Sequence, residues 1–144
     1  LEDLADSMYV SLSTVKNDLK EVKKILNEYN FDCNKYVVLS SSAMVLHGIK
    51  EYTRDIDISV TWDYYKYLLD NYDCVFERYD INGDKCYMMG DYINFGVTYF
   101  YGNKRIIDGL PVQDVCEIIK LKRGLNRGKD LEDLKLLMMY KKDN

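Results

Sequence analysis

Residues 52–60 read Tyr-Thr-Arg-Asp-Ile-Asp-Ile-Ser-Val, a stretch with two aspartates one residue apart. Its isoleucine and valine residues favour a β-strand, in which Asp55 and Asp57 point to one face and Ile56 and Ile58 to the other. Side-by-side carboxylates repel each other, whereas Mg²⁺ is often held by one or two carboxylates together with substrate phosphates. The pair therefore predicts a Mg²⁺ site with Asp55 and Asp57 as ligands. The alternative is a pair of solvated charges on an exposed strand face.

A strand and a helix joined by serines precede the aspartate pair. Residues 36–39 form a short apolar run typical of a buried strand, and residues 43–46 suit a buried helix capped by one of the serines. A sharp strand-to-helix turn leaves backbone N–H groups and the positive helix end at one point, which favours phosphate. The turn therefore predicts a nucleotide-phosphate site at Ser40, Ser41 and Ser42.

Residues 37–60 resemble the nucleotidyltransferase fold of the polymerase-β type, and more narrowly the small bacterial nucleotidyltransferases of the abortive-infection toxin type. The resemblance rests on Leu46-His47-Gly48 and on Thr53-Arg54-Asp55-Ile56-Asp57. It implies a toxin-antitoxin-like enzyme that uses Mg²⁺ and a nucleoside triphosphate, with Arg54 at the nucleotide. Ser40 stands where the family usually has glycine, and its Cβ disfavours a positive φ and crowds an approaching phosphate.

A second similarity lies near the C-terminus. Residues 112–122 predict a helix that begins after Pro111, and residues 127–130, Arg-Gly-Lys-Asp, open an amphipathic helix that runs to about Tyr140. The family similarly has a lysine late in one helix and an Arg-x-Lys-Asp segment at the start of the next. The resemblance implies that three cations lie near the triphosphate, and that an aspartate beside them is structural or catalytic: Lys122, Arg127, Lys129 and Asp130. The alternative is a solvated basic face, with Asp130 and Asp133 as acidic residues favoured by the dipole of the first helical turn, and for Asp133 we favour this interpretation.

A third acid is expected on a neighbouring strand of such a site. The alternating segment 91–100 predicts that strand, and Asn94 occupies its polar mid-strand position. An asparagine can coordinate a metal through its carbonyl oxygen, but it has no charge and cannot act as a base. We therefore place Asn94 with Asp55 and Asp57 as the catalytic candidates, and Asp91 replaces Asn94 only if the strand register differs.

The first 29 residues show two helical patterns around a turn, with Ser11 or Ser13 as the cap of the second helix. They resemble the helix-turn-helix of bacterial sugar-operon antiterminators and related winged-helix regulators. That resemblance implies four residues facing the major groove of DNA: Ser13, Thr14, Lys16 and Asn17. Six acids and four lysines give the segment a net charge of −2, which argues against strong DNA binding. The alternative is that these helices pack against the rest of the chain.

Composition sets the class of protein. The chain has 144 residues and a net charge of −4, which argues against a protein that binds nucleic acid or an anionic membrane without specificity. Four cysteines without Cys-x-x-Cys spacing, and one histidine, do not resemble a zinc site. With no signal peptide and no apolar stretch near 18 residues, we expect a cytoplasmic protein. The predicted fold is α/β, a small mixed sheet with flanking helices, divided into a helix-turn-helix-like segment (1–30) and a nucleotidyltransferase-like domain (31–144).

Two functions from different classes follow from these patterns. The first is an enzyme that moves a nucleoside monophosphate from a nucleoside triphosphate to a hydroxyl of a small molecule, a protein or RNA, with Mg²⁺ as cofactor. The second is a non-catalytic nucleotidyltransferase-like module that senses a ligand and carries a DNA-binding helix-turn-helix. The aspartate pair favours the enzyme, whereas Ser40 and Asn94 favour the regulatory module.

Overall fold

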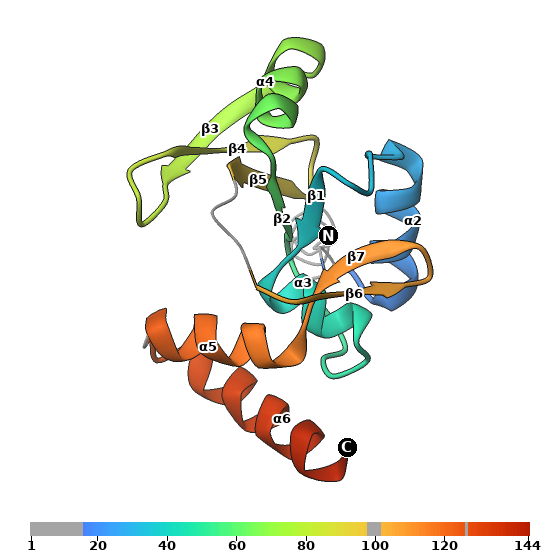
Figure 1. The fold of residues 1–144 in the computed structure, drawn as a ribbon, viewed down its shortest axis with the longest axis vertical. Coiled ribbons are helices and arrows are strands. Elements are labelled where there is room, and N and C mark those ends of the chain that lie inside the picture. Colours follow the sequence, from blue (N-terminus) through green and yellow to red (C-terminus); the bar gives the residue numbers. More distant parts are fainter. Residues whose placement is uncertain (1–15, 98–101, 126) are drawn as a thin grey trace, which may run out of the picture.

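The computed structural model describes residues 16–97, 102–125 and 127–144. Over these residues the chain forms five helices and one seven-stranded mixed sheet, so the α/β class with flanking helices is confirmed (Figure 1). In chain order the elements are α2 (Leu19–Tyr29), β1 (Tyr36–Val38), α3 (Ser40–Leu46), β2 (Ile56–Val60), α4 (Trp62–Asn71), β3 (Cys74–Tyr79), β4 (Lys85–Met89), β5 (Ile93–Val97), β6 (Lys104–Ile107), β7 (Leu110–Gln113), α5 (Val115–Leu125) and α6 (Asp130–Asp143).

The sheet has the order β3-β4-β5-β2-β1-β7-β6. The pairs β2–β5 and β1–β7 are parallel, and the other neighbouring strands are antiparallel. β2 therefore lies in the middle of the sheet, between β5 and β1. In the parallel pair, Asp57 lies directly opposite Asn94, and Ile58 lies opposite Phe95.

The two faces of the central strands have different surroundings. On one face Tyr65 of α4 packs on Phe95, with 5.8 Å between the ring centroids, and Ile58 beside Phe95 is almost fully buried. Successive strand residues point to opposite faces, so Asp57 and Asn94 point away from this core. One face of β2 and β5 thus stabilises the fold, and the other carries polar groups.

The helix α2 belongs to the same core as the sheet. Its side chains Val22 and Leu26 are 0% and 1% exposed and lie in the main hydrophobic cluster. The helix begins at Leu19, after the N-cap Asp18, whose side chain accepts a hydrogen bond from the Glu21 amide (2.9 Å). The predicted caps at positions 11 and 13 lie outside the described residues, but the start at Leu19 is later than either cap implies. The proposed boundary at residue 30 stays a prediction.

The segment before α5 differs from the prediction of a helix over residues 112–122. Residues 110–113 instead form β7, between β6 and β1, and the helix begins only at Val115. Asp114 marks the change, because its carboxylate accepts a hydrogen bond from the Cys116 amide (3.2 Å). The misassignment has a simple cause: a short segment with few apolar residues is compatible with either a buried strand or a helix turn.

Candidate functional site

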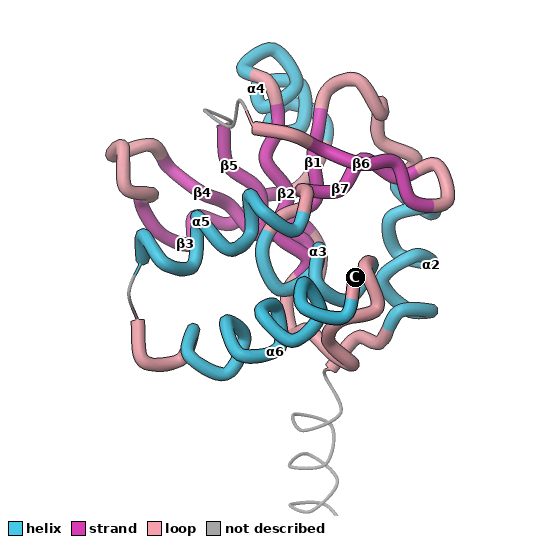
Figure 2. The backbone as a smooth tube through the Cα atoms, turned by 60° about the horizontal axis from the view of Figure 1, so that its bottom comes forward, coloured by secondary structure: helices cyan, strands magenta, loops and turns pink. Residues whose placement is uncertain are grey.

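A cleft of about 910 Å³ opens on the polar side of β2 and β5. Residues of the β3–β4 hairpin form one wall of this cleft, and residues of α5, α6 and the link between them form the opposite wall. The helices α5 and α6 lie side by side (Figures 1 and 2). Ten of the eleven residues predicted for catalysis, metal or nucleotide binding line this cleft: Ser40, Ser41, Arg54, Asp55, Asp57, Asn94, Lys122, Arg127, Lys129 and Asp130. The structure thus brings together three segments that are far apart in the sequence.

Two strands and the loop before them form the floor of the cleft. Asp57 on β2 and Asn94 on β5 are register partners, and Asp55 lies one residue before β2 begins. The Asn94 side-chain nitrogen contacts the Met88 sulfur at 3.3 Å, and the residue is 5% exposed. Asp91, the other candidate for the third acid, lies in the turn before β5 and is not part of the cleft lining.

The electrostatics of the floor are unfavourable for negative charge. Burial, and then the neighbouring Asp55 carboxylate, raise the pKa of Asp57 to about 6. Within the described residues neither Asp55 nor Asp57 has an ion-pair partner within 4.0 Å. The floor therefore holds two carboxylates whose charge the protein does not neutralise by direct contact.

The serine turn is shaped by Ser40. Ser40 has φ = +56°, a left-handed conformation that glycine adopts without strain and serine adopts at a cost. Its amide donates to the Gln113 side-chain oxygen (2.9 Å), so this N–H already has a partner. Ser42 does not line the cleft, because its side chain is fully buried and its hydroxyl accepts a hydrogen bond from the Asp57 amide (3.1 Å). Ser42 therefore joins α3 to β2, unlike the phosphate-binding role predicted for it.

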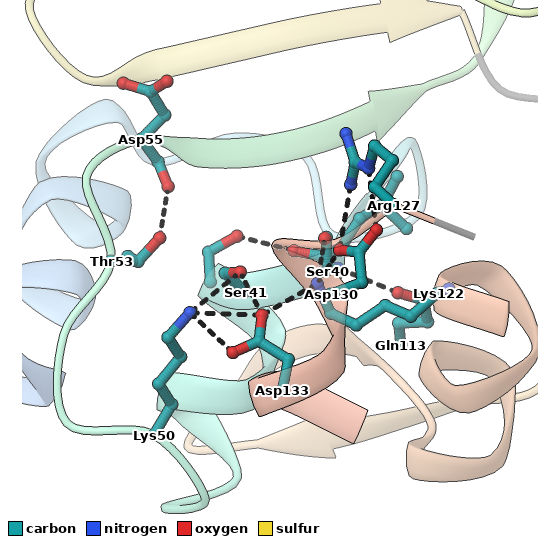
Figure 3. Close-up of polar contacts among 12 residues, drawn as sticks. Ser40, Ser41, Lys50, Thr53, Asp55, Gln113, Lys122, Arg127, Asp130 and Asp133 are labelled. Carbon is teal, nitrogen blue, oxygen red and sulfur yellow. Dashed lines mark hydrogen bonds and ion pairs between the residues drawn. The ribbon is translucent and has the colours of Figure 1, made fainter. Parts of the chain in front are cut away.

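A buried ion cluster forms the wall at α5 and α6 (Figure 3). Lys122 is 1% exposed, and its Nζ lies 3.0 Å from Asp133 and 3.4 Å from Asp130. Lys50 forms an ion pair with Asp133 at 2.9 Å, and Arg127 forms one with Asp130 at 2.7 Å. Each buried charge thus meets opposite charge on more than one side, which is what makes burial tolerable.

The pKa values of the two wall aspartates shift the opposite way from that of Asp57. The hydrogen bond from Arg127 lowers the pKa of Asp130 below its ordinary value. Burial by itself would raise the pKa of Asp133, but hydrogen bonds from Lys50 and Lys122 outweigh burial and lower it. Both wall carboxylates are therefore stabilised as anions by their neighbours.

Among the residues that the sequence patterns missed are Lys50, Arg78 and Asp133 of the cleft lining, and Gln113, which contacts Ser40. Asp133 was interpreted as a first-turn helix acid, yet it is 5% exposed and pairs with Lys50 and Lys122. Its spacing of three residues from Asp130 is a helical signal that predicts a shared face. Gln113 and Arg78 had no such signal, because the first lies in the strand mistaken for a helix and the second depends on an irregularity of β3.

The residues predicted to contact DNA have mixed placements. Positions 13 and 14 lie outside the described residues, and Lys16 lines the cleft with its Nζ 6.0 Å from the Tyr52 ring centroid. Asn17 differs from the prediction: it is 4% exposed, and its side chain donates to the Arg54 carbonyl (3.0 Å). Backbone hydrogen bonds to Thr53 complete this contact, so Asn17 holds the loop that leads to Asp55.

The part of the chain that the structure describes contains no group of three or more His, Cys, Asp or Glu side chains placed to hold a metal. The floor has two carboxylates and one amide instead. None of the helices in the described ranges is long and apolar enough to cross a bilayer.

Comparison with known proteins gives one match. A family model described as the Mga helix-turn-helix domain matches residues 1–42. The match supports the predicted helix-turn-helix likeness of the N-terminal segment, and it extends past residue 30 into β1 and α3. No curated protein and no solved structure matches the chain.

Proposed function

We propose that this protein is a Mg²⁺-dependent nucleotidyltransferase that moves a nucleoside monophosphate from a nucleoside triphosphate to a hydroxyl of a small molecule, a protein or RNA. The observation that carries the proposal is the register of β2 and β5, which sets Asp57 beside Asn94 on the floor of a cleft. Asp55 lies next to this pair, and cationic side chains surround it. Carboxylates beside cations suit a metal-bound polyphosphate.

The topology supports the polymerase-β type of fold for this proposal. β1 leads through the serine turn into α3, and the chain returns antiparallel as β2, which carries Asp57. β5 then adds parallel to β2 on its other side. This order matches the succession of strand, small-residue turn, helix and aspartate strand on which the resemblance rests.

The residues of the floor fit a Mg²⁺ ion. Mg²⁺ takes oxygen ligands, commonly one or two carboxylates, with phosphate and water oxygens completing the shell. Asp55 and Asp57 supply the carboxylates, and the Asn94 side chain has a carbonyl oxygen to add. Burial and the neighbouring Asp55 carboxylate raise the pKa of Asp57, and a cation bound between the two carboxylates would offset both effects. When bound, the metal would supply charge neutralisation at the reacting phosphate.

The side chains around the floor have separate roles in the proposed reaction. Arg54 and Lys129 are exposed and line the cleft, so their charge is available to the phosphates. The acceptor hydroxyl oxygen bonds to the α-phosphorus while the bond from that phosphorus to the bridging oxygen of the β-phosphate breaks, and pyrophosphate leaves. The hydroxyl proton passes to solvent, because the Asn94 amide cannot accept it.

Lys122 has a supporting role in this scheme. It is buried and already contacts Asp130, Asp133 and the Ser40 hydroxyl (3.4 Å). A lysine with these contacts neutralises its own neighbours and holds α5 and α6 against the serine turn. We therefore assign phosphate binding to the exposed cations and wall support to Lys122.

A second function, a non-catalytic regulator with a DNA-binding helix-turn-helix, is favoured by two observations. The Mga helix-turn-helix match covers residues 1–42. In addition, an amide stands at the position of the third acid, which leaves the floor without a general base. Under this alternative the cleft binds a nucleotide without transferring it.

Calorimetric titration of ATP, GTP, CTP and UTP, each with Mg²⁺, tests the first step of the proposal. We expect at least one nucleotide to bind in a Mg²⁺-dependent manner, and the double variant Asp55→Asn/Asp57→Asn to lose this binding. Asp70→Asn, an exposed residue of α4, is the matched control. Nucleotide binding that does not depend on Mg²⁺, or that the double variant retains, would overturn the proposal.

A transfer assay separates the two functions. The purified chain is incubated with α-³²P-labelled nucleoside triphosphates and with candidate RNA, protein and small-molecule acceptors, and release of pyrophosphate is recorded. Transfer supports the enzyme. Nucleotide binding without transfer, together with a gel shift of DNA from upstream of its own gene, supports the regulator.

A further inference from the structure

The strand β3 contains a bulge that changes which side chains reach the cleft. Phe76 lies opposite Tyr87 on β4, but the next paired residue is Arg78, opposite Cys86, so Glu77 is inserted between them. The Phe76 and Tyr87 rings lie 6.2 Å apart, and Tyr87 belongs to the side that packs on α4. Both Glu77 and Arg78 line the cleft. The extra residue therefore aims a guanidinium at the polar side of the sheet.

Arg78 differs from the arginine on the opposite wall. Arg127 is engaged by Asp130 through two hydrogen bonds of 2.7 and 3.1 Å. Arg78 is exposed, and across the described residues it forms no ion pair within 4.0 Å. Its charge is therefore available to a ligand in the cleft, whereas much of the charge of Arg127 is already neutralised.

Arg78 also lies within electrostatic reach of the floor. Burial and Asp55 raise the pKa of Asp57, and Arg78 offsets part of that rise, as do the smaller effects of Lys122 and Arg127. A cation near the floor on the hairpin side faces the same ligand that the α5–α6 wall faces. An elongated anion lying across Asp57 would thus have cations on both sides.

We propose that Arg78 is a polyphosphate-binding residue that contacts the β- and γ-phosphates of the nucleotide from the hairpin wall. This inference rests on the proposed nucleotidyltransferase function. The planar guanidinium group suits two-pronged hydrogen bonding to phosphate oxygens. Negative charge develops on the leaving pyrophosphate, so an arginine without an acidic partner stabilises the departing group as well as the bound triphosphate.

The test compares ligands with and without a polyphosphate chain, using the full chain and Mg²⁺ in calorimetry. The ligands are ATP, inorganic tripolyphosphate and AMP. We expect Arg78→Ala to weaken ATP and tripolyphosphate about 10- to 100-fold and AMP by less than about twofold, because a hydrogen bond between charged groups is lost only where those phosphates exist. The affinity of Arg78→Lys for ATP and tripolyphosphate is expected to fall between those of the wild type and Arg78→Ala, since lysine keeps the charge but cannot form the two-pronged hydrogen bonds of a guanidinium.

Lys85→Ala is the matched control, because Lys85 is a cation of the same hairpin that lies over the Phe76 ring on the other side. We expect it to bind all three ligands as the wild type does. Suppose that Arg78→Ala has an affinity for ATP within twofold of the wild type, and that Asp55→Asn/Asp57→Asn has lost Mg²⁺-dependent ATP binding. In that case the Arg78 inference is wrong and the proposed function stands. Equal weakening of AMP and ATP, or a lowered melting temperature of Arg78→Ala, would also overturn it. If the wild type binds none of the ligands, the proposed function fails as well.

Discussion

Two pairs of aspartates lie in the same cleft and have opposite environments. Asp55 and Asp57 lie on the floor without an ion-pair partner among the described residues, and the pKa of Asp57 is raised to about 6. Asp130 and Asp133 lie on the α6 wall among Lys50, Lys122 and Arg127, and their pKa values are lowered. The close spacing of two acids in the sequence therefore does not by itself mark a metal site.

The difference lies in whether cationic side chains of the protein contact the carboxylates directly. The wall aspartates form ion pairs with lysine and arginine side chains of the protein, so they stabilise the arrangement of α3, α5 and α6. Little of their negative charge is therefore available to a ligand. Under the proposed function, the floor aspartates receive their cation from solution. Removing a charged side chain of the wall should accordingly lower the free energy of unfolding, whereas removing an aspartate charge of the floor should raise it.

The largest effect is expected for Lys122→Met. This change leaves Asp130 and Asp133 buried without their shared lysine, and breaking a buried ion pair from one side costs about 3–5 kcal/mol. Urea unfolding measures the loss. Lys120→Met, at an exposed lysine of the same helix, should change the free energy of unfolding by less than about 0.5 kcal/mol. Equal stability of Lys122→Met and the wild type would remove the distinction between wall and floor.

Asp133→Asn should destabilise the protein by about 2 kcal/mol at neutral pH, the range of a hydrogen bond to a charged group. Because the pKa of Asp133 is lowered in the folded state, its contribution is present above the ordinary value of 3.8 and is lost as pH falls below it. The stability gap between variant and wild type should therefore narrow in acid. Unfolding curves from pH 3 to pH 8 provide the measurement, and a gap independent of pH would contradict the ion-cluster assignment.

Asp57→Asn should have the opposite sign. A carboxyl whose folded pKa is raised favours the fold while protonated, and that contribution is lost as pH rises from 3.8 through about 6. The variant should match the wild type near pH 4 and become more stable by about 1 kcal/mol above pH 7, after allowance for partial solvent exposure. The same urea series, run without divalent cations, tests this. A variant less stable than the wild type at pH 8 would mean that the floor charge is already compensated.

An effect as small as that of Asp57→Asn concerns the turn between the two regions. Ser40→Gly and Ser40→Ala both remove the hydroxyl contact to Lys122, but only glycine relieves the Cβ at φ = +56°. We expect Ser40→Gly to be more stable than Ser40→Ala by about 1 kcal/mol. Thermal unfolding of the two variants side by side measures the difference. Equal stability would show that the left-handed conformation is not strained.

Much of the local structure follows from short-range patterns. The strand predicted in residues 52–60 forms as Ile56–Val60, and the strand predicted in residues 91–100 is present over Ile93–Val97. The strand-turn-helix at Ser40 was also predicted, although serine adopts the positive φ that its Cβ disfavours. The helix predicted over residues 112–122 forms, but its predicted start was wrong: it begins at Val115, because residues 110–113 pair as a strand between β6 and β1.

The sequence by itself determined the α/β class, the aspartate strand and ten of the residues that line the cleft, because hydrophobic periodicity and turn chemistry act over a few neighbouring residues. Only the tertiary structure decided which aspartates are paired. Lys50 and Asp133 are 83 residues apart and meet through the packing of α6 near α3. It also decided that Asn94 lies beside Asp57, that Arg78 reaches the cleft and that Asn17 is buried, since register, a bulge and burial each depend on strands or loops brought together from elsewhere in the chain.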